Sequence, residues 1–364
     1  MICIAAFIVL GICVLTVPII RLFNKKLANN IMRLFKRSMH CLSRHVTFRA
    51  CDTSFQDDVK NTLLRKTVLK HPKWTRPLEI LIEIASLAII VLTIWSLLVG
   101  AKALVSLYVY GTCNPTTPSA CSLDSTEACS IDEAPIVFTE DPVGWTGNWF
   151  KQFGEAIAAI PTRAKHWEAS DYVPNITSYS AGKKDSRPVA VDIFDPGCVV
   201  CQRSYKAQKK AGFDKKYNVA LMVYPIKSAT ESSGYKYPNS YMVASYIVAT
   251  EIKTLKDAKT PAAWQIVDRM FTGKTSNEKE AIKEFDMGLS HDEAKKELRK
   301  WLKEIGYSDK EVKELDKLAK SKQVKDAIQA NYDTVENEIK TKKIPTMIFN
   351  GTRHDGEFTI ETKF

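Results

Sequence analysis

The chain of 364 residues carries 52 Lys and Arg against 41 Asp and Glu, a formal net charge of +11. Its length allows one sizeable domain with appendages, or two domains. A basic excess can indicate nucleic-acid binding, but residues 21–76 alone hold 14 Lys and Arg against three Asp, and the rest of the chain is balanced. We therefore predict no nucleic-acid partner.

Two apolar segments flank the basic one. The first 20 residues carry no charge, close to the length that crosses a bilayer, and residues 1–23 are predicted as a transmembrane helix. Residues 78–110 are predicted as a second, because their central part, 85–101, is also uncharged. For the first segment, the alternative is a cleaved signal peptide, which would need a basic leader and a small-residue cleavage site. For the second segment, the alternative is a buried core helix.

The basic loop, residues 24–77, orients both helices. A short loop rich in Lys and Arg stays in the cytoplasm, so the chain after about residue 111 is predicted to face outward. Apolar residues among the charges, such as Leu27, Ile31 and Leu34, could instead form an amphipathic helix on an anionic leaflet. A topology signal is the simpler interpretation.

Two of the nine cysteines, Cys3 and Cys13, fall in the first predicted span, and the other seven divide between the two sides of the membrane. Those of the basic loop, Cys41 and Cys51, should stay reduced. Five fall on the outer side: Cys113, Cys121, Cys129, Cys198 and Cys201. An odd number means that at least one is free or pairs between molecules. The first three lie in residues 111–142, a predicted linker rich in Cys, Pro, Ser and Thr, which an amphipathic helical segment, 143–174, follows.

A strand, a helix and a second strand come next. Residues 188–194 alternate as a strand does, and Asp195-Pro196-Gly197 is a turn. The helix then begins at Cys198-Val199-Val200-Cys201 and ends near Gly212, and residues 217–226 form the second strand. This order predicts a βαβ unit with parallel strands.

Roughly 100 residues of helical pattern follow. Residues 238–257 and 261–271 have helical periodicity, and capping boxes at Ser290 and Ser308 each predict a helix start. A further helical pattern runs from 321 toward 343. Residues 347–350 then read as a strand, Asn350-Gly351 as a tight hairpin turn, and 356–360 as the returning strand.

The two thiols of Cys198 and Cys201 are the candidate chemistry. The thiolate is the form that attacks a disulfide, and a helix N-terminus stabilises it. Cys198 is therefore predicted to be the exposed nucleophile, and Cys201 the resolving thiol one turn later. Zinc would need a second ligand pair, and no second C-x-x-C or suitable histidine pair occurs, so we predict no metal. An inert disulfide is the remaining alternative.

The segment VDIFDPGCVVC is similar to the active-site signature of the thioredoxin superfamily, and KKIPTMIFNG resembles its cis-proline strand. The resemblance implies a thioredoxin-like α/β fold over residues 175–364. The helical insertion, about 235–340, is similar to that of the DsbA class. It also implies that Asp192 assists proton transfer at Cys201, and that Ile344 and a cis Pro345 bind an extended substrate. A structural carboxylate with a backbone partner is the alternative for Asp192.

Two departures from the family pattern stand out. Gly197 occupies the position before Cys198, where relatives carry an aromatic residue, and the dipeptide between the cysteines is Val-Val. The redox potential of relatives therefore does not transfer to this chain.

The sequence thus predicts two transmembrane helices followed by a thioredoxin-like domain, in a multi-pass protein of the cell membrane with its catalytic domain extracytoplasmic. The function predicted is a thiol:disulfide oxidoreductase without a cofactor. Its expected partners are protein thiols and disulfides, a membrane redox partner and the lipid bilayer. Two other hypotheses stay open: a non-catalytic membrane adaptor whose thioredoxin-like groove binds extended peptides, with a static Cys198–Cys201 disulfide, and an electron relay through Cys113, Cys121 and Cys129. An ordinary linker disulfide is the simpler interpretation of those three cysteines.

Overall fold

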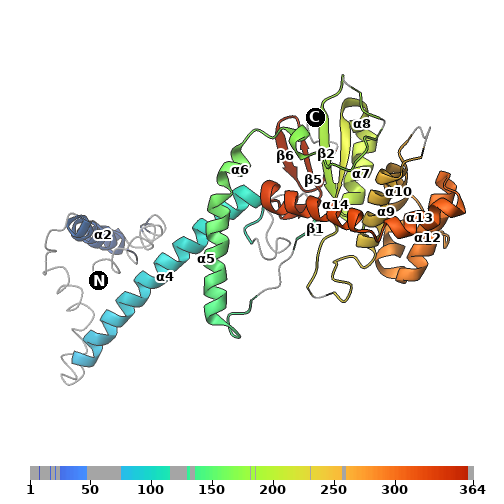
Figure 1. Ribbon diagram of the computed structural model, residues 1–364. Coiled ribbons are helices and arrows are strands. Elements are labelled where there is room, and N and C mark those ends of the chain that lie inside the picture. Colours follow the sequence, from blue (N-terminus) through green and yellow to red (C-terminus); the bar gives the residue numbers. More distant parts are fainter. Residues whose placement is uncertain are drawn as a thin grey trace. The chain divides into compact units, whose positions relative to one another are not determined.

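The structure is a computed structural model that describes residues 25–46, 75–114, 129–131, 136–180, 182–184, 186–229, 231–255 and 260–359, with single positions at 8, 17 and 21. The chain divides into two compact units, Met1–Ala101 and Lys102–Phe364. Figure 1 shows the elements of both. Each unit is described by itself.

The first unit contains α2 (Lys25–Val46), a helix of 22 residues inside the predicted basic loop. Its sequence places basic and apolar residues at helical spacing, the pattern of an amphipathic helix. The segment predicted as a loop is thus helical in part. The predicted first membrane helix, residues 1–23, lies outside the described residues apart from three single positions, and stays a prediction.

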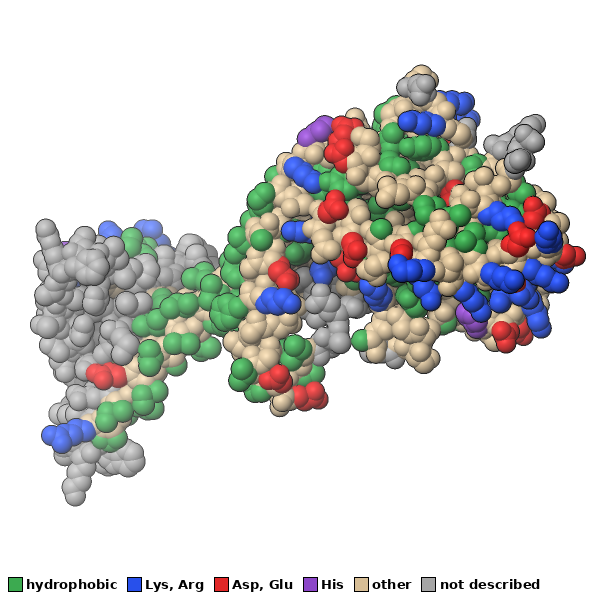
Figure 2. Space-filling model, viewed as in Figure 1, with side chains coloured by type: hydrophobic (Ala, Val, Ile, Leu, Met, Phe, Trp, Pro, Cys, Tyr) green, Lys and Arg blue, Asp and Glu red, His purple; other side chains and the backbone are tan. Residues whose placement is uncertain are grey.

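The helix α4 (Thr75–Tyr110) has 36 residues. Within the described part of the chain, Arg76–Tyr110 is the one candidate membrane span, with a mean hydropathy of 2.4 in its most apolar stretch. Figure 2 shows hydrophobic side chains along the helix, and many of the large ones are exposed, among them Ile80, Leu92, Leu97 and Leu104. Its length and composition suit a bilayer crossing.

The second unit is built on a four-stranded sheet in the order β3-β2-β5-β6. The strands are β2 (Val189–Phe194), β3 (Asn218–Val223), β5 (Thr346–Phe349) and β6 (Thr352–Asp355). The helices α7 (Val199–Ala211) and α8 (Phe213–Lys216) connect β2 to β3, which pair in parallel. The predicted βαβ unit is therefore confirmed. Every residue of β3 is buried, as expected of a parallel strand covered on both faces.

The hairpin β5–β6 completes the sheet. Asn350 and Gly351 have φ values of 48° and 72°, the left-handed conformations that a tight two-residue turn requires. The predicted turn is confirmed, but the returning strand begins at Thr352 and not at residue 356. The reason is that a two-residue turn places Thr352 directly opposite Phe349.

The helical insertion comprises α9 (Ser240–Ile252), α10 (Ala262–Thr272), α11 (Ala281–Lys283), η4 (Glu284–Gly288), α12 (His291–Ile305), α13 (Asp309–Leu318), α14 (Lys322–Asp333) and η5 (Thr334–Ile339). Both predicted capping boxes are confirmed: Ser290 pairs with Glu293 and Ser308 with Glu311. Figure 1 shows these helices beside α7, where α10 packs on α7. They share one core with the sheet.

The remaining elements of the second unit are α5 (Pro142–Ala158), α6 (Ile160–Ala164), η3 (Ala169–Tyr172) and two short strands, β1 (Cys129–Ser130) and β4 (Lys343–Ile344). The last turns of α4 pack on α5 through Val109 and Ala156. The buried Arg353 donates hydrogen bonds to the carbonyl oxygens of Val109 and Ile339, at 2.7 and 2.6 Å. These contacts fasten the end of α4 to the sheet.

Candidate active site

Cys198 is the N-cap residue of α7, as the sequence predicts. Its Sγ accepts a hydrogen bond from the backbone N–H of Cys201, 3.4 Å away. The turn before it is held by the Asp195 carboxylate, which accepts from the N–H of Gly197 at 2.7 Å. The sulfur of Cys198 therefore lies at the positive end of a helix dipole, where negative charge on sulfur is stabilised.

Cys198 forms a disulfide with Cys129, 69 residues earlier in the chain, and Cys201 is a free, buried thiol. The prediction that Cys198 is exposed is wrong in this state, because its exposed fraction is 0% beneath β1. The Cys198–Cys201 bond of the adaptor hypothesis is not formed. The relay hypothesis requires a bond between a linker cysteine and the dithiol, and one is present. Cys113 is disulfide-bonded too, whereas Cys121 lies outside the described residues.

The strand that carries Cys129 pairs with the residues before Pro345. Cys129 is opposite Ile344 and Ser130 opposite Lys343, in antiparallel register, and the N–H of Ile131 donates to the carbonyl oxygen of Lys342 at 3.1 Å. The Ile344–Pro345 peptide bond is cis, which confirms the expectation from the sequence. The predicted substrate-binding residues thus lie directly beside the sulfur bonded to Cys198.

Asp192 lies on β2 and is buried. Its Oδ2 accepts a hydrogen bond from Nε2 of Gln208 at 2.9 Å, while its buried Oδ1 has no partner among the described residues. Burial raises the pKa of Asp192 to about 6, and the Gln208 hydrogen bond opposes that rise. The partner of Asp192 is a side chain rather than the backbone group that the structural alternative proposed.

A second buried carboxylate, Asp195, was not among the predicted site residues. It accepts from the N–H groups of Gly197 and Ile226, each at 2.7 Å, and burial raises its pKa to about 7. Burial also raises the pKa of the Cys201 thiol well above its usual range, and the charges of Asp195 and Asp192 raise it further, against backbone hydrogen bonds that lower it. Cys201 is therefore held as a protonated thiol that needs a base.

Tyr237 is the other site residue that sequence reasoning missed. Its hydroxyl donates to Cys129 Sγ at 3.0 Å. A Cβ placed on Gly197 would lie 2.4 Å from Cβ of Tyr237, so only glycine fits beneath this side chain. The side chain of Tyr237 therefore lies directly against the residue before Cys198, from 40 positions further along the chain. No local motif marks Tyr237 in the sequence.

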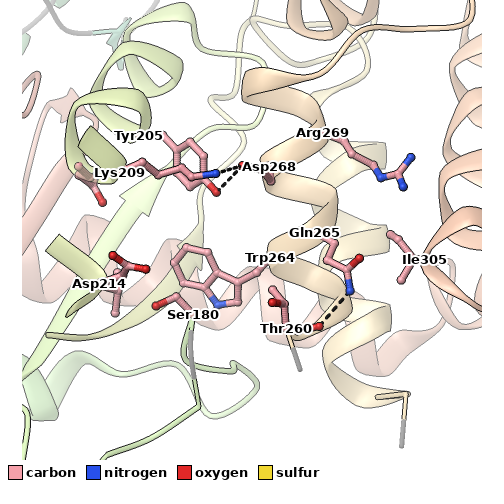
Figure 3. A pocket seen from close by; sticks show the side chains of 12 residues that line it. Ser180, Tyr205, Lys209, Asp214, Thr260, Trp264, Gln265, Asp268, Arg269 and Ile305 are labelled. Carbon is pink, nitrogen blue, oxygen red and sulfur yellow. Dashed lines mark hydrogen bonds and ion pairs between the residues drawn. The ribbon is translucent and has the colours of Figure 1, made fainter. Parts of the chain in front are cut away.

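A cavity of about 640 Å³ lies between α7 and α10, lined by residues that include Tyr205, Lys209, Trp264 and Asp268 (Figure 3). Neither Cys198 nor Cys201 lines it. Gln208 does line the cavity. Its side-chain amide, which donates a hydrogen bond to Asp192, therefore lies between the cavity and the Asp192 carboxylate. The dithiol chemistry is located at the edge of β4 instead. The described residues contain no cluster of three metal-ligating side chains.

The sheet order, the cysteine pair at the start of α7 and the cis-proline together define a thioredoxin-like mixed α/β fold with a helical insertion. No protein-family model and no curated protein sequence matches the chain.

Several solved structures are similar to part of the chain. Proteus mirabilis ScsC in a transitional conformation is 16% identical, with a TM-score of 0.34 over 62% of this chain and 89% of that one. MdbA, a thiol-disulfide oxidoreductase from Corynebacterium diphtheriae, is 14% identical, with a TM-score of 0.36 over 51% and 92%. The thiol-disulfide exchange protein α-DsbA2 from Wolbachia pipientis is 15% identical, with a TM-score of 0.35 over 51% and 82%. These likenesses are too weak to transfer a function.

Proposed function

We propose that this protein is a membrane-tethered thiol:disulfide oxidoreductase that acts on extracytoplasmic protein thiols and disulfides. One observation carries the proposal: the sulfur of Cys198, at the start of α7, is bonded to a cysteine on an extended strand that pairs beside the cis Pro345. A protein substrate that forms a mixed disulfide with Cys198 needs the same two contacts, one through sulfur and one through its backbone.

Cys198 is the nucleophile of the proposed reaction. Its thiolate, stabilised at the helix N-terminus, attacks a substrate disulfide and displaces one substrate sulfur as a thiolate. The mixed disulfide is then resolved by Cys201, which attacks Cys198 Sγ and releases the second substrate sulfur. Two electrons pass from the dithiol to the substrate, and the reverse sequence oxidises a substrate dithiol.

Asp192 is the proposed base for Cys201. The thiol of Cys201 must lose its proton before it attacks, and burial disfavours that loss. Both oxygens of Asp195 already accept backbone hydrogen bonds, whereas Oδ1 of Asp192 has no partner among the described residues. Of the two carboxylates, Asp192 is thus the one with an oxygen ready to accept the proton.

Ile344 and Pro345 are the proposed substrate-binding residues. The backbone before Pro345 pairs with an extended segment through Lys342, Lys343 and Ile344. Backbone pairing of this kind supplies affinity for an extended peptide without demanding a particular side chain. It therefore suits an enzyme that meets many protein thiols.

The exposed apolar surface of α4 supports the membrane anchor. The 14 Lys and Arg in residues 21–76 support a cytoplasmic position for that segment, and hence an outer position for the domain after residue 111. Disulfides such as Cys129–Cys198 persist there. A second span at residues 1–23, contact with the lipid bilayer, and a membrane redox partner that recycles the dithiol complete the proposal.

Insulin reduction by the purified, detergent-solubilised chain tests the reaction. We expect Cys198→Ser to abolish turnover and Cys201→Ser to accumulate mixed disulfides with insulin, detectable on non-reducing gels. Cys41→Ser, on the proposed cytoplasmic side, is the matched control and should turn over as the wild type does. Wild-type turnover by Cys198→Ser would refute the proposal.

The burial of both cysteines of the Cys129–Cys198 disulfide favours a second candidate, a non-catalytic adaptor in which that bond is static. A titration of the bond against glutathione and dithiothreitol buffers separates the two functions. A structural disulfide has a reduction potential below about −300 mV, whereas a catalytic one lies well above that value.

A further inference from the structure

The segment 129–131, which contains β1, makes the contacts that the proposed function requires of a substrate. Its sulfur is bonded to Cys198, its backbone pairs with Ile344 and Lys343, and the N–H of Ile131 reaches the carbonyl of Lys342. Cys129 is buried, and the partly buried Ile131 packs against the main core. A segment of the chain itself therefore occupies the place proposed for an extended substrate.

We propose that Cys129 is a third redox-active thiol of this site, which competes with Cys201 and with external substrates for the sulfur of Cys198. This inference rests on the proposed function and deepens it. Residues 129–131, called the internal strand below, then act as a tethered substrate, which must leave the site before an external substrate can bind.

The exchange step conserves electrons within the chain. Cys201, deprotonated by Asp192, attacks Cys198 Sγ; the Cys129–Cys198 bond breaks, and the Cys198–Cys201 bond forms. Cys129 leaves as a thiolate and then takes up a proton, so one thiol and one disulfide are present before and after. The Tyr237 hydroxyl donates to Cys129 Sγ at 3.0 Å, where it stabilises the negative charge on the departing sulfur. No external oxidant or reductant takes part.

The internal strand also indicates a substrate class. Its cysteine is followed by a small polar residue, Ser130, and then by Ile131, which packs against the core. Because an external peptide uses the same edge of β4, we expect the best substrates to be extended segments with an aliphatic residue two positions after the reactive cysteine.

Disulfide mapping of the full chain by mass spectrometry, after equilibration in graded glutathione buffers and acid quenching, tests the exchange. We expect both Cys129–Cys198 and Cys198–Cys201 in the wild type, in a ratio that stays constant while the buffers change the total oxidised fraction, because the exchange conserves electrons. Cys201→Ser should retain only Cys129–Cys198, and Cys129→Ser only Cys198–Cys201. The absence of Cys129–Cys198 from the wild type in every buffer would overturn the inference.

Kinetics with a synthetic peptide disulfide containing Cys-Ser-Ile, and with a Cys-Ser-Asp analogue, test the competition. If the internal strand occupies its place nine-tenths of the time, its loss in Cys129→Ser lowers KM about tenfold. Ile131→Ala, which keeps the thiol, should lower KM by less. The Cys-Ser-Ile peptide should have the lower KM of the two.

The two proposals fail in different ways. Equal turnover of the wild type and Cys198→Ser removes the proposed function itself. A different result would refute only the role of Cys129. In that case Cys198→Ser is inactive, Cys129→Ser keeps the wild-type KM, and Cys129 is never found bonded to Cys198.

Discussion

The candidate site has two sides that are built differently. The helix side, residues 192–208, comes from one stretch of chain and holds Cys198, Cys201 and Asp192. The strand side comes from three distant places, residues 129–131, Tyr237 and residues 342–345. The first is fixed by local folding, whereas the second is assembled by contacts between segments that lie far apart in the sequence.

Their stabilisation follows the same division. On the helix side, the buried polar groups bond within the fold, as Gln208 does with Asp192 and Ile226 with Asp195. On the strand side, the internal strand has two paired residues, one further backbone hydrogen bond and one disulfide. A hydrogen bond contributes only about 1 kcal/mol net, so this strand depends on its covalent bond to stay in place.

The largest effect on stability is expected on the helix side, from Asp192→Asn. Burial raises the folded-state pKa of Asp192 to about 6, above the unfolded value of about 3.9. The stabilisation from the neutral acid is therefore complete below about pH 4 and is lost as the pH rises through 6. The variant should raise the free energy of unfolding at pH 8 by on the order of 3 kcal/mol, and by little at pH 4.

Urea denaturation of the oxidised protein at both pH values measures this difference. Asp326→Asn, at an exposed carboxylate on α14, is the control and should change stability by less than about 0.5 kcal/mol at either pH. If the free energy of unfolding of Asp192→Asn changed with pH as that of the wild type does, Asp192 would not titrate in this range.

A smaller effect is expected where the two sides meet, from Gly197→Ala. The added Cβ would lie 2.4 Å from Cβ of Tyr237, and such overpacking costs about 1–3 kcal/mol. Thermal unfolding should show the loss, and the double variant Gly197→Ala with Tyr237→Gly, which removes the opposing Cβ, should recover part of it. A double variant whose losses simply add would contradict the contact.

The smallest effect is expected on the strand side, from Tyr237→Phe, which keeps the ring and removes the hydroxyl. The hydroxyl stabilises the departing sulfur by about 1 kcal/mol. Its loss should slow the exchange from Cys129–Cys198 to Cys198–Cys201 about fivefold. Rapid alkylation followed by mass spectrometry measures the rate. Tyr235→Phe, at a tyrosine that stacks on Tyr241, is the control and should exchange at the wild-type rate.

Sequence reasoning located the helix side because its signals are local. The strand before Asp195, the cysteines at a helix start and Gly212 at its left-handed end lie within 24 residues, and each obeys a rule of secondary structure. Ile344-Pro345-Thr346 was found through a resemblance, and the cis bond agrees with it. Capping boxes marked the insertion helices for the same local reason.

The sequence does not predict the strand side, because no local sequence pattern distinguishes its residues. Cys129 is one of three linker cysteines at seven-residue gaps, and its pairing with Ile344 depends on where the linker packs. Tyr237 reaches the sulfur from a loop whose sequence has no cysteine nearby. Asp195 was treated as a turn residue, although an aspartate after a buried strand often caps the next backbone N–H groups, a signal that could have identified it.

The 69-residue separation of Cys129 from Cys198 has one further consequence. A thiol tethered in the same chain meets its partner at an effective concentration on the order of millimolar, whatever the concentration of the protein. An external thiol displaces Cys129 only when its own concentration and affinity together outweigh the effective concentration and affinity of Cys129. Under the proposed function, this competition screens out dilute, weakly pairing thiols, and the tethered Cys129 contributes to the selectivity of the site.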